Sequence, residues 1–288
     1  MALFNLGSIN ADFVYSVPHI PAPGETLSST GRKVYLGGKG ANMSVAAARA
    51  GSSVFHIGAV GHDGRWAVER LANYGVNTDH IAEIEVETAQ AIIAVDSAGE
   101  NAIILHPGAN HAIDEDIVAP ALERAKPGDW LVTQNETNAQ KTTLERGKAR
   151  GMKIAYAAAP FSAQAVKDVL PLLDFLILNR VEADQLFQAT DQHPDELGVS
   201  DVIVTEGGDG ATWYGENGAV KIVPVPVKPV DTTGAGDTFT GYVLAGLDLG
   251  LPMEEALSLA SRAGALMVTR HGTADVIPTL AEVRAFQP

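Results

Sequence analysis

The sequence predicts an α/β fold, a mostly parallel sheet covered on both faces by helices, with a small second β-sheet that could act as a lid. Short apolar runs alternate with segments of helical periodicity over most of the 288 residues, a pattern typical of parallel sheets. Residues 11–36 and 84–106 interrupt this rhythm with extended, polar-alternating sequence, and we assign them to the small sheet. Because 46% of residues are hydrophobic and 19% are charged, we expect one domain spanning 1–288, with a sizeable core.

The expected strands are runs of about four to eight apolar residues, the length and composition of buried parallel strands. In chain order they are Leu3–Leu6, Val54–Val60, Ala91–Val95, Trp130–Thr133, Lys153–Ala157, Phe175–Leu178, Val202–Thr205 and Lys221–Val225. The expected helices carry apolar residues three or four positions apart. They are Ala41–Ala50, Ala67–Tyr74, Asp114–Ala125, Thr137–Arg150, Ser162–Leu173, Val181–Gln188, Thr238–Leu249 and Met253–Arg270.

Charge and composition exclude several classes of function. A formal net charge of −15 disfavours binding to nucleic acid or to an anionic membrane through the general surface. No apolar run reaches the length of a bilayer span, and the absence of cysteine excludes disulfides and thiolate metal sites. The eight histidines show no His-x-x-x-His pattern, so we expect no zinc-type site. We expect a cytoplasmic protein in which any phosphate site is built locally from backbone N–H groups, a few cations and metal.

The most informative segment is residues 231–239, Asp-Thr-Thr-Gly-Ala-Gly-Asp-Thr-Phe, which precede an apolar helical pattern. Gly234 and Gly236 let the backbone turn sharply and approach a ligand closely. The helix that begins here directs unpaired N–H groups at that ligand, so the segment suits an anion such as a phosphoryl group. Asp237 lies in the first turn, where it is either a catalytic base or an ordinary first-turn carboxylate.

Two further polar segments are candidates for binding a hydroxyl-bearing substrate. Lys39 and Asn42 lie in Gly-Gly-Lys-Gly-Ala-Asn at 37–42, where glycines leave the backbone bare around a cation and an amide. Asn10 and Asp12 follow the first strand, and ligands of open α/β sheets bind beyond the carboxyl ends of strands. The alternatives are a flexible turn with an N-cap for the first segment and an Asx turn for the second.

Two segments after later strands could serve a nucleotide and its metal. Asn179 and Glu182 are three residues apart at a helix start, and their oxygens suit Mg²⁺ bound through water. The same pair also fits a simple capping box. Residues 205–210, Thr-Glu-Gly-Gly-Asp-Gly, form a glycine-rich loop that can lie along a nucleotide, or they form only a tight hairpin. Neither a Gly-x-x-x-x-Gly-Lys-[Ser/Thr] motif nor a dinucleotide fingerprint after the first strand is present.

Taken in order, these segments resemble the ribokinase-like (PfkB) carbohydrate kinases nearly from end to end. The resemblance rests on Leu6–Asp12, Pro21–Thr26, Gly37–Asn42, Gly108–Asn110, Gln134–Glu136 and, most specifically, Asp231–Phe239. It implies the three-layer α/β/α fold of that family and ATP-dependent phosphorylation of a hydroxymethyl group on a small sugar. The glycine-lysine motif together with Ser-Ile-Asn-Ala-Asp points to D-ribose and formation of ribose 5-phosphate. Fructose, a nucleoside or another sugar is the alternative within the family, and a non-catalytic sugar- or nucleotide-sensing protein is the alternative outside it.

The resemblance also implies roles for individual residues. Asp237 would take the proton from the sugar hydroxyl, and the backbone of Gly234, Ala235 and Gly236 would form an anion hole. The sugar would be bound by Asn10, Asp12, Gly38, Lys39, Asn42, Glu136 and Asp237. ATP would contact Asn179, Thr205, Gly207, Gly210 and Gly236, with Mg²⁺ near Glu182. Asp231 and Thr233, with carbonyls near Met267, Arg270 and Gly272, would hold a monovalent cation such as K⁺, unless Asp231 only caps a turn or pairs with Arg270. The lid segments would pair two subunits into a homodimer.

Several positions depart from the family pattern. Arg180 and Val181 replace the Glu-Thr that often lies between Asn179 and Glu182, and Ala157–Pro160 replaces Asn-Pro-Ala-Pro. Trp66 stands where glycine is frequent, and the stretch from 188 to 201 is short for the helix found there in the family. Val276 replaces a hydroxyl-bearing residue, which leaves one cation ligand missing or replaced by water.

Overall fold

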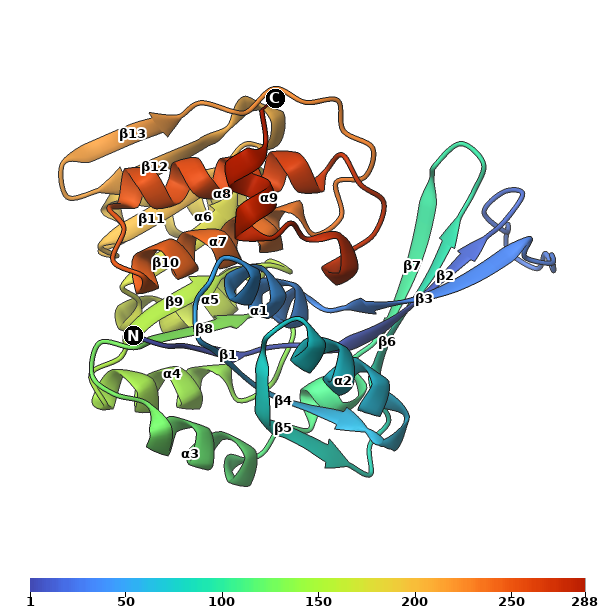
Figure 1. Ribbon diagram of the computed structural model, residues 1–288, viewed down its shortest axis with the longest axis horizontal. Coiled ribbons are helices and arrows are strands. Elements are labelled where there is room, and N and C mark those ends of the chain that lie inside the picture. The colour runs from blue at the N-terminus through green and yellow to red at the C-terminus, as the bar shows by residue number, and fades with distance from the viewer. Residues whose placement is uncertain (288) are drawn as a thin grey trace.

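The structure is a computed structural model that describes residues 1–287, and its main element is a nine-stranded sheet (Figure 1). The strand order is β13-β12-β11-β10-β9-β8-β1-β4-β5, and pairing is antiparallel only at β11–β12 and β12–β13. The strands are β1 Leu3–Leu6, β4 Val54–Gly61, β5 Asn77–Ile84, β8 Trp130–Gln134, β9 Lys153–Ala157, β10 Phe175–Asn179, β11 Asp201–Thr205, β12 Ala211–Gly215 and β13 Gly218–Ile222. The expected mostly parallel sheet is therefore confirmed.

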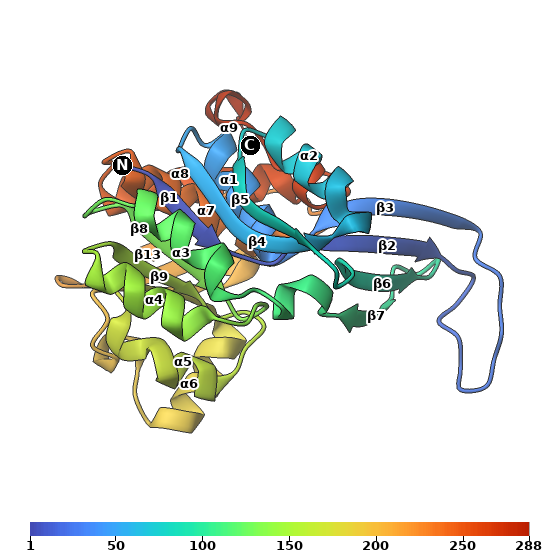
Figure 2. The ribbon, with the colours of Figure 1, turned by 90° about the horizontal axis from the view of Figure 1, so that it is seen from below.

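Helices cover both faces of this sheet and give the three-layer architecture (Figure 2). One face packs against α1 Lys39–Arg49, α2 Arg65–Asn73, α7 Ala235–Asp248, α8 Met253–Met267 and α9 Leu280–Ala285. The other packs against α3 Glu115–Arg124, α4 Gln140–Ala149, α5 Ala163–Val169 and α6 Arg180–Thr190. Each face has its own buried apolar cluster, so the sheet separates two cores. Within residues 1–287, no helix combines the length and apolar character needed to cross a membrane.

A second sheet of four strands projects from the body (Figure 1). Its order is β3-β2-β6-β7, with β2 Asn10–Ser16, β3 Gly31–Gly37, β6 Ala89–Val95 and β7 Asn101–His106. The expected small sheet from segments 11–36 and 84–106 is confirmed, although residues 84–88 end β5 and connect it to β6. Segment 7–12 leads from β1 of the large sheet into β2 of the small sheet, and segment 37–42 leads from the end of β3 into α1.

Some elements differ from the sequence-based expectation for identifiable reasons. The strand expected at Lys221–Val225 ends at Ile222, because Pro224 and Pro226 cannot donate to a strand ladder. The helix expected over Ser162–Leu173 ends at Val169 and continues as a 3₁₀ turn that contains Pro171. The helix expected from Thr137 begins only at Gln140, after Ala139 in a left-handed conformation. Strands β5 and β12 and helix α9 were not expected.

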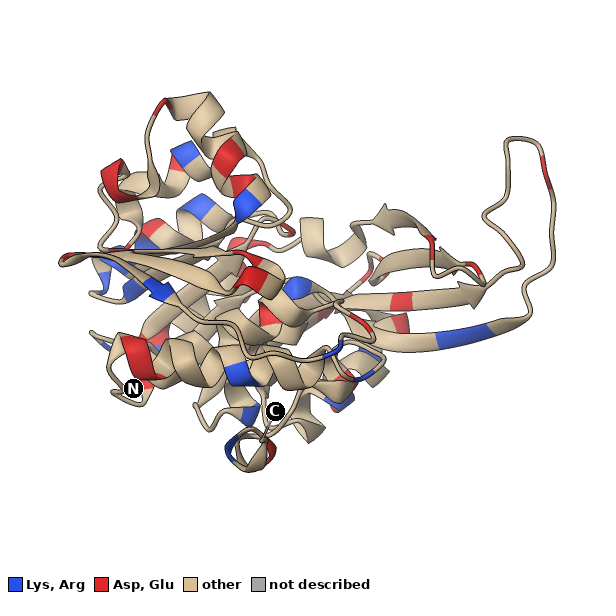
Figure 3. Cartoon of the chain, turned by 90° about the horizontal axis from the view of Figure 1, so that it is seen from above, with Lys and Arg blue, Asp and Glu red and all other residues tan. Residues whose placement is uncertain are grey.

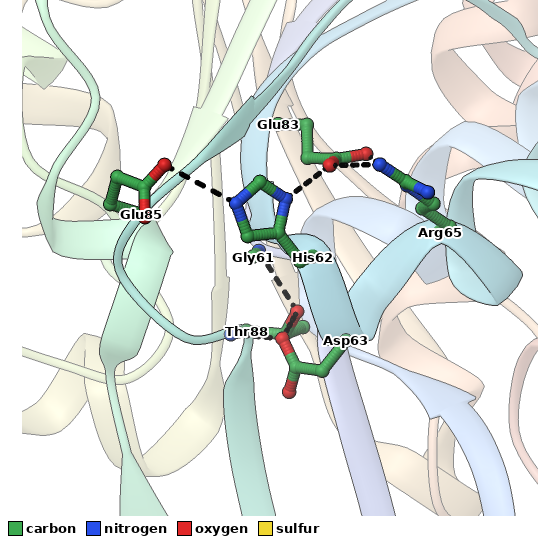
Figure 4. Close-up of polar contacts among 7 residues, drawn as sticks. All are labelled: Gly61, His62, Asp63, Arg65, Glu83, Glu85 and Thr88. Carbon is green, nitrogen blue, oxygen red and sulfur yellow. Dashed lines mark hydrogen bonds and ion pairs between the residues drawn. The ribbon is translucent and has the colours of Figure 1, made fainter.

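The junction between the two sheets is held by the loop that follows β4 (Figure 4). Asp63 Oδ1 accepts hydrogen bonds from the backbone N–H of Thr88, at 3.0 Å, and from its hydroxyl, at 2.8 Å. The Thr88 hydroxyl oxygen in turn accepts from the N–H of Gly61 at 3.0 Å. These bonds attach the segment that enters β6 to the body of the protein.

An exposed ionic cluster reinforces the same junction. The His62 ring lies between the carboxylates of Glu83 and Glu85 (Figure 4), and Arg65 makes a two-nitrogen contact with Glu83 at 2.5 and 2.6 Å. The hydrogen bonds to Glu83 and Glu85 raise the pKa of His62. Arg65 and His62 together lower the pKa of Glu83 to about 2. Because all four side chains are at the surface, salt screens the cluster, and its contribution to stability is small.

Candidate active site

The start of α7 forms an anion-binding turn with a buried carboxylate beside it. Gly234 is the N-cap, in the left-handed region with φ 74°, and Asp237 lies in the first turn. Within residues 1–287 the Gly236 N–H has no acceptor, and a Cβ at Gly236 would meet no atom within 4 Å. The Ala235 N–H donates a long bond to the Thr232 carbonyl, at 3.3 Å. Of the expected anion hole, the N–H groups of Gly234 and Gly236 thus have no acceptor among the described residues, and Gly236 also has open space beside its Cα.

Asp237 is 8% exposed and receives a hydrogen bond from Asn42 Nδ2 to its Oδ2, at 2.9 Å. Burial raises the pKa of Asp237, while the charge of Lys39 and the bond from Asn42 act in the opposite direction. The carboxylate is thus more basic than an exposed one but is still held by a cation, which suits a group that accepts a proton near neutral pH.

Further polar groups converge beside Asp237. Asp12 is buried, with Oδ1 lacking any hydrogen-bond partner among the described residues. Burial, followed by the charges of Glu136 and Asp237, raises the pKa of Asp12 to about 7. The pKa of Lys39 is raised chiefly by Asp237 and further by Glu136. A buried carboxylate oxygen without a donor is costly, and a sugar hydroxyl would supply that donor.

Two residues of this cluster were missed from sequence. The Ser8 hydroxyl donates to Glu136 Oε2, which also accepts from the Lys39 N–H at 3.0 Å. Asn110 donates from Nδ2 to Asn10 Oδ1 at 2.8 Å and accepts from the Ile9 N–H at 3.0 Å. Asn110 lies in the 3₁₀ turn Gly108–His111 that follows β7, and its Gly108-Ala109-Asn110 sequence, a glycine and a small residue before a polar one, was the available signal. Gly38 has φ 92°, which a non-glycine residue would adopt only with strain.

A cavity of about 430 Å³ lies on the other side of the α7 turn. Among its lining residues are Thr205, Gly207, Gly210 and Gly236, four of the expected ATP contacts. The others were not expected and are mostly apolar: Gly208, Pro224, Val225, Pro226, Val227, Pro229, Thr232, Ala235, Phe239, Ser261, Gly264, Ala265 and Val268. The size and the apolar walls fit a heterocyclic base. The loop 205–210 connects the antiparallel strands β11 and β12, so the hairpin interpretation is confirmed, and the same loop lines the cavity.

Asn179 and Glu182 form a capping box at the start of α6. The Asn179 side chain accepts from the Glu182 N–H at 2.9 Å, and Glu182 Oε2 accepts from the Asn179 N–H at 2.8 Å. Asn179 pairs with Thr205 across β10 and β11, so it lies at the same sheet edge as the cavity, although it is not among the lining residues. Burial raises the pKa of Glu182, and Lys39 opposes this rise.

Asp231 folds the loop that precedes the anion-binding turn. Its Oδ1 accepts from the Thr233 N–H at 2.9 Å, and its Oδ2 accepts from the Gly272 N–H at 3.2 Å. Asp231 therefore caps this turn, and the alternative pairing with Arg270 is wrong, because Arg270 contacts Glu282 at 2.7 Å. The Met267 carbonyl accepts from the Arg270 N–H at 2.9 Å.

Comparison with known proteins identifies the family. A family model described as pfkB family carbohydrate kinase matches residues 3–280. The chain belongs to this family. It is 35% identical over 298 residues to a ribokinase of Haemophilus influenzae, covering 98% of this chain and 96% of the relative.

Solved structures agree with this family assignment. A ribokinase of Cryptococcus neoformans in complex with ADP has a TM-score of 0.83 and 32% identity, covering 99% of both chains. An Arabidopsis thaliana ribokinase complexed with ribose and ATP has a TM-score of 0.87 and 26% identity, covering 99% of this chain and 97% of the other. The expected fold and family are thus confirmed.

For a pfkB carbohydrate kinase, the described geometry has a direct chemical meaning. Phosphoryl transfer needs an acceptor hydroxyl, a donor phosphate and a positive or N–H-rich environment between them. The polar cluster and the apolar cavity lie on opposite sides of the α7 turn, with Asp237 and the Gly236 N–H between them. The arrangement therefore offers a polar surface, an apolar cavity and a buried carboxylate between them.

Proposed function

We propose that the chain is an ATP-dependent sugar kinase that transfers the γ-phosphoryl group to the terminal hydroxyl of D-ribose. The observation that carries this proposal is the position of Asp237, buried at the start of α7 between the polar cluster and the cavity. The names and complexes of the relatives support ribose and ATP as the reactants.

In the proposed reaction, Asn10, Asp12, Lys39, Asn42 and Glu136 bind the sugar hydroxyls. Asp237 orients the terminal hydroxyl and accepts its proton as the oxygen attacks the γ-phosphorus. The N–H of Gly236, with those of Gly234 and Ala235, stabilises the charge on the transferring group. The small sheet acts as a lid that excludes water and so suppresses ATP hydrolysis.

Mg²⁺ and ATP fit the same edge of the sheet. Glu182 uses Oε2 in the capping box and retains Oε1, and hard cations such as Mg²⁺ prefer oxygen ligands and keep several waters. Within residues 1–287, no three His, Asp or Glu side chains converge as a metal site. We therefore assign Glu182 a contact through water and leave most of the coordination to phosphate oxygens. Bound Mg²⁺ would neutralise phosphate charge.

A monovalent cation such as K⁺ is proposed beside Asp231. The Asp231 carboxylate lies three residues before Gly234, and two anions at short range repel. Each carboxylate oxygen accepts one backbone N–H, which leaves lone pairs for a cation. The carbonyls of Thr233, Met267, Arg270 and Gly272 complete the proposed ligands.

We also propose a homodimer formed through the small sheet. Its strands carry few charges compared with the body (Figure 3), and its outer strand exposes Ile103, Ile104 and Leu105 by 52%, 67% and 61%. Contiguous apolar exposure of this kind is typical of an interface. Ile104→Glu should convert a dimer into a monomer in light scattering, whereas a wild-type monomer would refute the proposal. A cytoplasmic location fits the absence of cysteine.

The proposal is tested by ATP turnover against D-ribose, 2-deoxy-D-ribose, D-fructose and a nucleoside. We expect D-ribose to have the highest kcat/KM, with phosphate on its terminal oxygen. A preference of about tenfold or more for fructose or a nucleoside would refute ribose and retain the family activity. Absence of turnover with every sugar, combined with measurable sugar or nucleotide binding, would favour the sensing protein instead.

A further inference from the structure

A buried polar network lies beneath the two sugar-binding segments, inside an otherwise apolar part of the sheet. It joins side chains from β1, α1, β4 and β8, all of them 0% exposed: Asn5, Ser44, His56 and Gln134. None of them faces the proposed reactants, and none has been given a role above. Polar side chains destabilise a core unless their donors and acceptors form hydrogen bonds. The presence of four such side chains together therefore needs a physical explanation.

The hydrogen bonds of the network define the tautomer of His56. His56 Nε2 lies 3.0 Å from the Gly7 carbonyl oxygen, which can only accept, so Nε2 carries the proton. Nδ1, at 2.8 Å from the Ser44 hydroxyl, is then the acceptor of the Ser44 O–H. Burial lowers the pKa of His56 to about 4, which keeps the ring neutral around neutral pH.

The other end of the network reaches the second segment. Asn5 donates from Nδ2 to Ser44 Oγ and to the Gly40 carbonyl, each at 2.9 Å. Asn5 Oδ1 accepts from Gln134 Nε2, also at 2.9 Å. The network thus runs from Gln134 through Asn5 and Ser44 to His56. It donates hydrogen bonds to the carbonyl oxygens of both Gly7 and Gly40.

Those two glycines are the place where the sugar-binding segments touch. A Cβ at Gly40 would lie 2.4 Å from Gly7 Cα, and a Cβ at Gly7 would lie 2.6 Å from Gly40 Cα. Backbone therefore packs directly on backbone. Two hydrogen bonds also join the segments, from the Ala41 N–H to the Ser8 carbonyl at 2.9 Å and from the Gly40 N–H to Ser8 Oγ at 3.2 Å. Above this contact lie Asn10 and Asp12 on one segment and Lys39 and Asn42 on the other.

We propose that His56 is a positioning residue that, with Ser44 and Asn5, fixes the separation of segments 7–12 and 37–42 and thereby sets the affinity for the sugar. The inference rests on the proposed sugar-binding role of these segments. A purely stabilising role would be served as well by apolar side chains of similar volume. Apolar side chains cannot orient the Gly7 and Gly40 carbonyls, whereas the hydrogen bonds from His56 and Asn5 do so and add to the direct contacts between the segments.

Three variants of His56 separate its two bonds. His56→Phe removes both bonds and should raise KM for D-ribose by about tenfold. The values of kcat and of KM for ATP should stay within about twofold of the wild type, because only ground-state binding of the sugar is lost. His56→Gln keeps a donor at the position of Nε2 and should raise KM by only about two- to threefold. His56→Asn keeps an acceptor towards Ser44 but loses the donor to Gly7, so it should resemble His56→Phe.

The matched control is His80→Phe. His80 lies on β5, paired with Ile57 of β4, and its Nε2 has no partner among the described residues. The His80→Phe substitution should leave KM for D-ribose unchanged. Ser44→Ala is a second test that retains the ring, and it should raise KM in the same direction even if His56→Phe fails to fold.

The thermal denaturation midpoint is measured for each variant. Lower stability in His56→Asn and Ser44→Ala with wild-type KM for D-ribose would overturn the inference and leave a structural role. A wild-type preference for another sugar would instead refute D-ribose as the substrate, and the same series of variants would then be measured with that sugar. The two failures are therefore distinguishable.

Discussion

The two sides of the α7 turn differ in the chemical character of the residues that line them. On one side, Asn42 donates a hydrogen bond to Asp237, and the charge of Asp237 contributes to the raised pKa values of Asp12 and Lys39. On the other, the cavity is lined by glycines, prolines and apolar side chains, with few groups that could titrate. The chemistry of the first side suits recognition of individual ligand atoms, whereas that of the second suits recognition of shape. Substitutions should therefore separate the two sides cleanly in steady-state kinetics.

The largest effect is expected where the two sides meet. Asp237→Asn removes the proton acceptor and should lower kcat by roughly 10²–10⁴-fold, with little change in ADP affinity by calorimetry. Near-wild-type turnover would remove Asp237 from the mechanism and leave a first-turn carboxylate of α7.

Asp12→Asn tests atom-by-atom recognition on the polar side. Loss of a charged acceptor should raise KM for D-ribose by roughly 10–100-fold and leave KM for ATP unchanged. Because the pKa of Asp12 is raised to about 7, the ionised, stronger acceptor gains population as pH rises from 6 to 8. KM for D-ribose should fall over that range in the wild type and vary less in the variant. An equal pH dependence in both proteins would assign the titration to another group.

The stability linkage of Asp12 has the opposite sign to its binding linkage. A carboxyl whose folded pKa exceeds its unfolded value holds a proton in the folded state that the unfolded chain has lost. Between pH 4 and 7 the folded wild type therefore loses stability as pH rises. Asp12→Asn should show a shallower decline in urea denaturation over the same window.

Ala265→Leu tests recognition by shape on the apolar side. Ala265 lies on α8 in the wall of the cavity, and a larger side chain there should raise KM for ATP by about tenfold. KM for D-ribose should be unchanged. Ser258→Leu, on the exposed side of the same helix, is the matched control. Equal changes in both Michaelis constants would show that the two sides are not independent.

The smallest expected effect concerns the loop that joins the two sides. Replacing a large organic cation by K⁺ at equal ionic strength should raise kcat/KM several-fold, because an ordered loop aims its N–H groups at the phosphoryl oxygens. Asp231→Ala should abolish the difference. Equal rates in both buffers would show that the bonds from Thr233 and Gly272 to Asp231 are sufficient.

The contrast between the two sides also explains what the sequence could reveal. Asp237, Lys39 and Glu136 are far apart in sequence, yet each stands among glycines or after a strand end, and the structure brings them together. Charged residues in such settings are conspicuous because a core excludes them. Thr279 and Glu282 show the opposite case, since their capping box marks the start of α9 but was overlooked beside the longer patterns.

The apolar wall could not be predicted in the same way. Phe239, Ala265 and Val268 continue the periodic apolar pattern of α7, α8 and its end, so nothing distinguishes a side chain that lines a cavity from one that fills a core. The Pro-Val alternation at 223–230 was visible, but it indicated only an extended segment. His56 and Asn5 were hidden for another reason, because each is a single polar residue in an apolar strand, with partners on other elements.

The small sheet has a consequence for how affinity is measured. Asn10 and Asp12 belong to β2, whereas Asn42 and Asp237 belong to α1 and α7 of the body. The complete site exists only in molecules whose small sheet lies against the body, so the observed dissociation constant is the intrinsic constant divided by the fraction of such molecules. If the small sheet lies against the body in roughly one-tenth of the molecules, the sugar binds about tenfold more weakly than it would to a population in which every molecule has the complete site. For the proposed sugar site, the Asp63–Thr88 junction would therefore set part of the affinity through the population that it maintains.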